Sequence, residues 1–124
     1  MDPHEVIDAV AERLFRSFER NDPAGVSDCC APGAVFVRNG RRQGVIEELA
    51  PGFATLHERI GWHRYSDVRR SVFDGGFVEE HLVESDLPNG ERLSSMVCVV
   101  ASVDGEGRVT ELREYAPARS RPPG

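Results

Sequence analysis

A carboxylate and an imidazole stand two positions apart at Glu79 and His81, inside the stretch that runs from Phe77 to Val83. In a β-strand this spacing puts both side chains on one face, because successive side chains point to opposite faces. A carboxylate stabilises the charged form of a neighbouring histidine, whereas burial pushes a carboxylate toward its neutral form. If this face lines a pocket, the pair is suited to general acid and base catalysis.

The opposite register of this stretch stays open from the sequence alone. It would bury Val78 and Leu82 and turn Glu79 and His81 toward solvent. Two aliphatic side chains are better core material than a glutamate and a histidine, and periodicity does not decide between the two faces. We take the inward register as the working hypothesis.

A third candidate, Glu114, lies in the last expected strand, Arg108 to Ala116. It shares a face with Leu112, which favours an inward position, and a buried carboxylate has to be hydrogen-bonded or functional. We expect Glu114 to line the pocket as the catalytic base. An exposed position beside Arg113, or a structural ion pair with Arg38, stays open as an alternative.

The elements that position these residues are predicted from apolar periodicity and from turn residues. Asp2 and Pro3 suit the start of a helix. The expected helices run from Asp2 or Pro3 to about Arg20, from Pro23 to about Ala31, and from Gln43 or Gly44 to about Ile60, the last kinked or split at Pro51. The expected strands are Ala34–Arg38, Trp62–Phe73, Phe77–Asp86, Leu93–Val103 and Arg108–Ala116.

The last four strands are separated by three turn sequences, Asp74–Gly76, Leu87–Gly90 and Asp104–Gly107, each with glycine where a positive φ is required. Helices followed by such a meander predict an α+β domain whose N-terminal helices pack in the concave face of a strongly bent, mainly antiparallel sheet. A chain of 124 residues, 40% of them hydrophobic, is long enough for one core and too short for two. We expect one domain over residues 1–116 and a flexible tail over 117–124.

A sheet bent in this way would enclose a cavity with mainly apolar walls. Arg38 is expected at its mouth, where it could hold an anionic or enolate oxygen, and a solvated position at the strand end is the alternative. The residues expected to contact a substrate along the walls are Leu14, Phe18, Phe36, Phe53, Trp62, Val97, Val99 and Leu112.

Composition excludes several classes of function. The net charge of -6 and the scattered arginines give no footprint for nucleic acid, and the lack of lysine excludes Schiff-base chemistry. Cys29, Cys30 and Cys98 have neither a disulfide pattern nor a metal-ligand spacing, so we expect no metal and no cofactor. The sequence shows no leader and no membrane-spanning apolar run, which predicts a cytoplasmic protein without a membrane partner.

Five segments carry a family resemblance: Arg13–Phe15, Asn21–Pro23, Cys30–Val35, Asp104–Val109 and Arg113–Tyr115. With them, residues 5–116 resemble the nuclear-transport-factor-2-like superfamily, and within it the SnoaL-like group of polyketide cyclases, ketosteroid isomerases and limonene epoxide hydrolases. The resemblance implies the cone-shaped, cystatin-like fold and a cavity for a small organic ligand. It does not name the reaction, because this fold hosts many unrelated functions.

The departures from the family's known sites are informative. The tyrosine, the base and the second acid of the isomerases would fall at Leu14, near Arg38 and near Val99, and none of these has the required chemistry. The epoxide hydrolases end in a similar Arg-Asp-Tyr strand, where this chain has Arg113-Glu114-Tyr115. Their other two partners, an arginine and an aspartate, would fall near the carboxylate and imidazole described first, so their triad is incomplete here.

Taken together, the residues and the resemblance predict a SnoaL-like small-molecule enzyme of unknown substrate. Glu114 would act as the base, aided by His81 and Glu79, in acid/base isomerase, cyclase or hydrolase chemistry on an apolar or polycyclic ring compound. The alternative is a non-catalytic ligand-binding or dimerisation domain of the same superfamily.

Under both hypotheses we expect a homodimer, because an open antiparallel sheet with an apolar outer face invites covering. The residues expected to point outward on that face are Cys98, Val100, Val109 and Tyr115.

Overall fold

The structure, a computed structural model, describes residues 2–60 and 63–117, with the backbone alone for residues 54–60. Its helices are α1 (Pro3–Glu19), α2 (Pro23–Asp28) and α3 (Ile46–Ile60). Its strands are β1 (Cys30–Arg38), β2 (Arg41–Val45), β3 (His63–Phe73), β4 (Gly76–Asp86), β5 (Arg92–Val103) and β6 (Val109–Tyr115).

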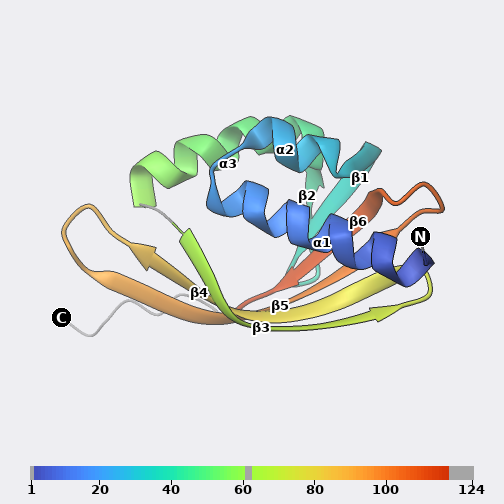
Figure 1. The fold of residues 1–124 in the computed structure, drawn as a ribbon. Helices are drawn as coiled ribbons and strands as arrows, with labels where there is room; N and C mark the ends of the chain where they lie inside the picture. The colour runs from blue at the N-terminus through green and yellow to red at the C-terminus, as the bar shows by residue number, and fades with distance from the viewer. Residues whose placement is uncertain (1, 61–62, 118–124) are drawn as a thin grey trace.

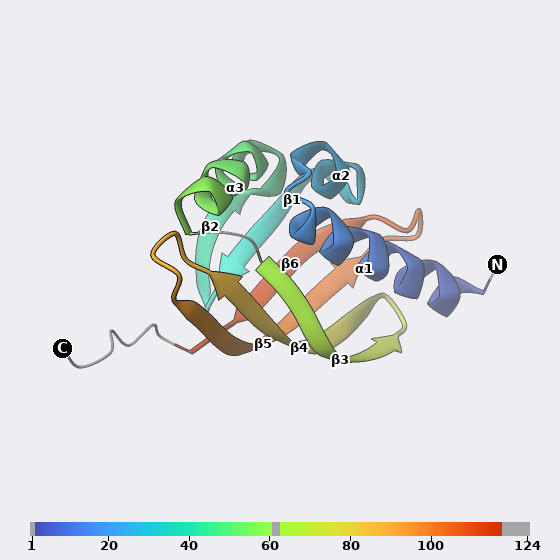
Figure 2. The ribbon, with the colours of Figure 1, turned by 60° about the vertical axis from the view of Figure 1, so that its left-hand side comes forward.

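The strands form one six-stranded sheet in the order β2-β1-β6-β5-β4-β3. Neighbouring strands run antiparallel except β1 and β6, which are parallel. The sheet is strongly bent, and the helices lie on its concave side (Figure 1). Figure 2 shows α1 lying over β3 to β6, with α2 and α3 beside the end of the sheet that holds β1 and β2. The predicted α+β architecture is confirmed.

Helix α1 begins where the sequence predicts. The Asp2 carboxylate accepts the backbone N–H of His4 at 2.8 Å, and Pro3 occupies the first turn, where its missing N–H costs nothing. One stripe of the helix is buried against the sheet and supplies much of the core: Ile7, Val10, Ala11, Leu14 and Phe15.

The region between residues 30 and 46 differs from the prediction. Strand β1 already begins at Cys30, and Arg41–Val45 forms a further strand, β2, so α3 begins at Ile46. Asn39 and Gly40 both have positive φ, 49° and 79°, which closes β1 and β2 into a hairpin. The sequence Arg-Arg-Gln-Gly has little strand character of its own; pairing with β1 gives it a strand conformation. Pro51 lies inside α3, which stays a single helix.

The expected outward position of Val109 is wrong. The pairing of β5 with β6 shifts between Ser102 and Val103, so that Val103 pairs with Val109 while Ser102 pairs with Glu111. In a regular strand Val109 and Leu112, three positions apart, would point to opposite faces. The bulge moves Val109 to the inner face, where it is fully buried like Leu112. Tyr115, by contrast, lies outward and is 43% exposed, and its partner Cys98 is half-buried.

Within residues 2–60 and 63–117, no helix has both the length and the apolarity needed to cross a membrane.

Candidate functional site

Strand β4 has the inward register. Phe77, Glu79 and His81 are 0%, 1% and 2% exposed, whereas Val78 and Leu82 on the opposite face are half-buried. Glu79 and His81 are therefore in the core beside Phe77, and Val78 and Leu82 are on the outer face of this strand. The alternative register, with Val78 and Leu82 in the core, is wrong.

The carboxylate of Glu79 lies between the guanidinium of Arg70 and the imidazole of His81. One carboxylate oxygen, Oε1, accepts from Arg70 Nε at 2.6 Å, and the other, Oε2, lies 2.6 Å from His81 Nδ1. Both oxygens thus have a partner, as a buried carboxylate requires. The result is a chain of three groups, guanidinium, carboxylate and imidazole, on the inner face of β3 and β4.

Arg70 connects this chain to α1. Its Nη1 donates to Asp8 Oδ1 at 2.9 Å and its Nη2 to Glu12 Oε2 at 3.0 Å, and its side chain is only 11% exposed. Burial alone would lower the pKa of Arg70, but the hydrogen bonds to Asp8, Glu79 and Glu12 outweigh it and raise that pKa. Hydrogen bonds from Arg70 and then Arg16 lower the pKa of the Glu12 carboxyl in turn. Arg70 is thus held as a cation between two elements.

Aromatic rings enclose the imidazole of His81. The Tyr65 ring stacks on it with centroids 4.5 Å apart and planes at 20°, and the Phe15 ring of α1 meets it edge-on at 5.0 Å. Burial, followed by the negative charges of Glu114, Glu19 and Glu79, raises the pKa of Tyr65. The Tyr65 hydroxyl therefore keeps its proton at neutral pH and is available as a hydrogen-bond donor.

A β-bulge explains why both Tyr65 and Arg70 point inward. Ser66 pairs with Leu82 and Arg69 with Glu80, so Asp67 and Val68 together stand opposite the single residue His81. The extra residue switches the alternation of side chains along β3. Sequence reasoning missed both Tyr65 and Arg70 because an unbroken strand cannot place an odd and an even position on one face. Asp67, with a positive φ of 51°, marks the bulge, but no glycine signals it in the sequence.

Glu114 lies on the same face in line with Glu79. Val99 pairs with Glu79 on one side and with Glu114 on the other, so the two carboxylates flank a buried valine across three strands. Glu114 is half-buried, and its charge contributes to the raised pKa of Tyr65. Arg38 is the register partner of Glu114 on the parallel strand β1 and is exposed.

The expected wall residues fall into two groups. Phe53 meets the rings of Phe18 and Phe36 edge-on, with centroids 5.6 Å and 6.0 Å apart, and all three are half-buried. Trp62 lies outside the described residues. The remaining four are buried in the core between α1 and the sheet: Leu14, Val97, Val99 and Leu112.

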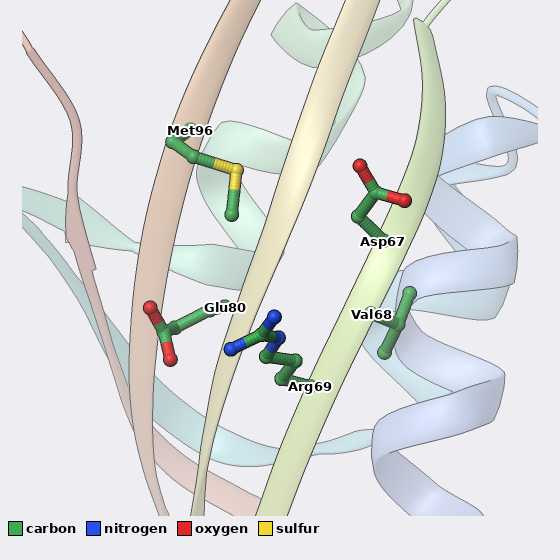
Figure 3. A pocket seen from close by; sticks show the side chains of 5 residues that line it. All are labelled: Asp67, Val68, Arg69, Glu80 and Met96. Carbon is green, nitrogen blue, oxygen red and sulfur yellow. The ribbon is translucent and has the colours of Figure 1, made fainter.

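Neither of two pockets among the described residues is lined by Glu79, His81 or Glu114. The larger, about 400 Å³, lies on the outer face over the β3 bulge (Figure 3). The smaller, about 10 Å³, lies beside Phe18 and Phe53 and has room for about one water molecule. Five side chains line the outer pocket: Asp67, Val68, Arg69, Glu80 and Met96.

The outer pocket lacks the groups expected of an active site. Arg69 and Glu80 are register partners on neighbouring strands, and the lining contains no histidine and no buried carboxylate. Its walls are exposed side chains, Met96 among them at 47%. We therefore place the candidate site on the inner face. Among the described residues, no three His, Cys, Asp or Glu side chains come together in a way that could hold a metal ion.

Comparison with known proteins gives structural matches only: no family model and no curated protein matches the chain. A candidate polyketide cyclase from Xanthomonas campestris pv. campestris has a TM-score of 0.81 at 14% identity, covering 92% of this chain and 92% of that one. An LEH-like epoxide hydrolase from M. tuberculosis has a TM-score of 0.77 at 21% identity, covering 91% and 83%. An NTF2-like protein of unknown function from Burkholderia pseudomallei K96243 has a TM-score of 0.78 at 14% identity, covering 90% and 91%.

Identities this low establish a fold and leave the reaction open. The similarity nevertheless covers at least 90% of this chain in each of the three matches. The chain has the fold of the nuclear-transport-factor-2-like superfamily.

Proposed function

We propose that this protein is a cofactor-independent enzyme of the SnoaL-like group that applies acid/base chemistry to a small, largely apolar ring compound. The observation that carries the proposal is the Glu79–His81 pair, which is buried on the concave face with its atoms 2.6 Å apart. Burying a charged pair is costly unless its partners compensate, so a fold retains one mainly where it has a use. Catalysis is such a use, because a buried histidine held by a carboxylate can accept and return a proton.

Each group on the inner face has a role in this proposal. Glu114 is the base that removes a proton from a carbon of the ligand or from an attacking water. Glu114 then returns that proton to the ligand at a second position, so an isomerisation leaves the proton count unchanged. His81, held by Glu79, accepts a proton at Nε2 from the ligand or from water and gives it back. Tyr65 keeps its hydroxyl proton and donates a hydrogen bond to the oxygen on which negative charge develops. It would replace the oxyanion donor that Leu14 cannot supply.

The ligand class follows from the surroundings of these groups. Phe15 and Tyr65 lie against His81, and Phe18, Phe36 and Phe53 form the second aromatic cluster, so aromatic rings surround few polar atoms. Structural neighbours support the class: their names include a candidate polyketide cyclase, an LEH-like epoxide hydrolase and a candidate isomerase from Bacillus subtilis.

The test compares two glutamates of strand β6 that point to opposite faces. The probes are a β,γ-unsaturated cyclohexenone, for isomerisation to the conjugated enone, and cyclohexene oxide, for hydrolysis to the diol. Glu114→Gln should lower kcat/KM on the accepted probe about 100-fold or more, with little change in melting temperature. Glu111→Gln, on the outer face beside Arg113, is the matched control and should retain activity. Equal activity in both variants would remove Glu114 from the reaction.

A non-catalytic ligand-binding domain is the second candidate. Its supporting observation is that Arg70 and Glu79 satisfy each other, so the buried charges need no ligand to be stable. This candidate predicts saturable binding of naphthol to the inner face, with no turnover of either probe by the wild-type protein.

We also propose that the protein forms a homodimer through the outer face of the sheet. Met96 is 47% and Tyr115 43% exposed there, and Leu82, the register partner of Met96, is half-buried. A second copy would cover these residues together with the outer pocket, which Met96 also lines.

A further inference from the structure

Arg70 is the buried group for which the proposed reaction has no role. It takes no part in a proton transfer, yet its guanidinium makes ion pairs with three carboxylates, Asp8, Glu12 and Glu79, which come from two different elements. Two of these partners lie on α1 and are exposed at the surface, and the third lies on β4 and is 1% exposed. The ion pairs therefore run from the surface of α1 to the interior.

We infer that Arg70 is a positioning residue: it keeps Glu79 ionised, so that His81 carries its proton on Nδ1 and leaves Nε2 free to exchange a proton with the ligand. The inference rests on the proposed function for the use of Nε2, but the state of the ring follows from the geometry. A carboxylate whose Oε1 accepts from a guanidinium at 2.6 Å is held in its ionised form. An ionised carboxylate only accepts hydrogen bonds, so the hydrogen between Oε2 and His81 Nδ1 has to belong to the ring.

The bulge in β3 makes this arrangement possible. Asp67 and Val68 stand opposite His81, and the change of alternation there brings Tyr65 to the face of the ring and Arg70 to the carboxylate that holds it. One irregularity thus supplies both the stacking partner and the electrostatic partner of His81. Without the bulge, a strand that turned Tyr65 inward would turn Arg70 to the outer face.

The groups around the ring come from several elements. Glu79 of the same strand lies 2.6 Å from Nδ1, Tyr65 of β3 stacks on the ring, and Arg70 of β3 holds Glu79. The charges of Glu19 on α1 and Glu114 on β6 act on Tyr65. Arg70 is the largely buried cation among them, and it holds the Glu79 carboxylate in its ionised form. Removing Arg70 should therefore let the pair take up a proton, either as a protonated Glu79 beside a ring with its hydrogen on Nε2 or as an imidazolium beside the carboxylate. In either state Nε2 would carry a hydrogen.

The test is NMR of the histidine ring nitrogens in the full-length protein, with the His81 signals assigned by their loss in His81→Gln. In the wild-type protein at neutral pH, Nδ1 should be the protonated nitrogen and Nε2 the unprotonated one. In Arg70→Gln this pattern should be lost, because Glu79 no longer has the charged partner that holds it ionised, and Arg70→Lys, which keeps the charge, should retain it better. Arg64→Gln is the matched control: Arg64 lies on the same strand as Arg70, and the change removes an exposed ion pair with Asp86 of β4. It should leave the protonation of the His81 ring unchanged.

Two results would overturn the inference. One is a wild-type ring protonated on Nε2, a reading that needs no variant and so still decides the matter if Arg70→Gln does not fold. The other is a folded Arg70→Gln protein in which Nδ1 is still protonated and Nε2 still unprotonated at neutral pH. Neither reading depends on turnover, so a protein that binds ligands without catalysis would refute the proposed reaction and leave the role of Arg70 intact.

Discussion

The two faces of strand β4 depart from the usual arrangement of polar and apolar side chains at four positions. Glu79 and His81 are almost fully buried on the concave side, while Val78 and Leu82 are half-buried on the convex side and Glu80 is exposed. A strand selected only for stability would place its aliphatic residues in the core and its charges in water. The difference indicates that the inner face is arranged around polar groups, while the outer face leaves Met96 and Tyr115 exposed.

The buried charges are weak evidence for stability as such. Replacing a buried ion pair by well-packed apolar residues is often neutral or stabilising, whereas removing one member of the pair is costly. The inner face therefore has a stringent requirement, because each member of the Arg70–Glu79–His81 chain depends on the others. The outer face makes no comparable demand on single residues.

The largest expected effect comes from Glu79 compared with its neighbour Glu80. Glu79→Ala removes the shared acceptor of Arg70 and His81 and should lower the free energy of unfolding by about 3 kcal/mol, measured by urea denaturation. Glu80→Ala, which removes an exposed carboxylate opposite Arg69, should change it by less than about 1 kcal/mol. Similar losses in the two variants would mean that the faces do not differ in the way described.

A second contrast concerns self-association. Met96→Glu places a charge on the outer face of β5 and should shift a dimer to monomer in sedimentation velocity at micromolar concentration. Leu93→Glu is the matched control, since Leu93 lies on the same strand with the inward parity of Val97 and is 36% exposed. A wild-type protein that stays monomeric at every concentration, or equal dissociation in both variants, would rule out this face as the interface.

The smallest expected effect concerns the surface end of the ion-pair chain. The pKa of Glu12 in the folded protein lies below its ordinary value of 4.5, so its contribution to stability is present above that value and is lost as the pH falls through the folded pKa. Glu12→Gln should therefore be less stable than the wild type at neutral pH. Because the side chain is 48% exposed, solvent screening limits the difference to less than about 1 kcal/mol.

Urea denaturation of the wild type and of Glu12→Gln over a range of pH checks this prediction. The two unfolding curves should converge below the folded pKa of Glu12, and added salt should bring them together at neutral pH as well. A difference that persisted unchanged at low pH would have to come from packing instead of charge.

Much of the fold could be predicted from local signals. Asp2 and Pro3 start α1, and the glycine turns at Gly75 and Gly107 separate the strands of the meander. Strand β2 was missed because Arg41–Val45 becomes a strand only by pairing with β1, a contact between segments rather than a property of the segment.

The site could be predicted only in part, for a related reason. The sequence places Glu79 and His81 on one face, but the choice of face depends on Arg70, which pairs with Glu79 and is itself held by Asp8 and Glu12 of α1. Tyr65 and Arg70 were missed because the bulge at Asp67 and Val68 breaks the alternation without a glycine to signal it. Irregularities of this kind are set by the packing of whole strands.

We propose that ligands bind at the inner face of the sheet, at His81. On this view the larger pocket on the outer face is only a consequence of the β3 bulge at Asp67 and Val68. Titration with naphthol, followed by NMR of the His81 ring nitrogens and of the Met96 methyl group in one sample, tests this claim most directly. We predict that the His81 signals shift in a saturable way while the Met96 methyl signal stays in place. A saturable shift of Met96 with no change at His81 would contradict the claim and move the binding site to the outer pocket.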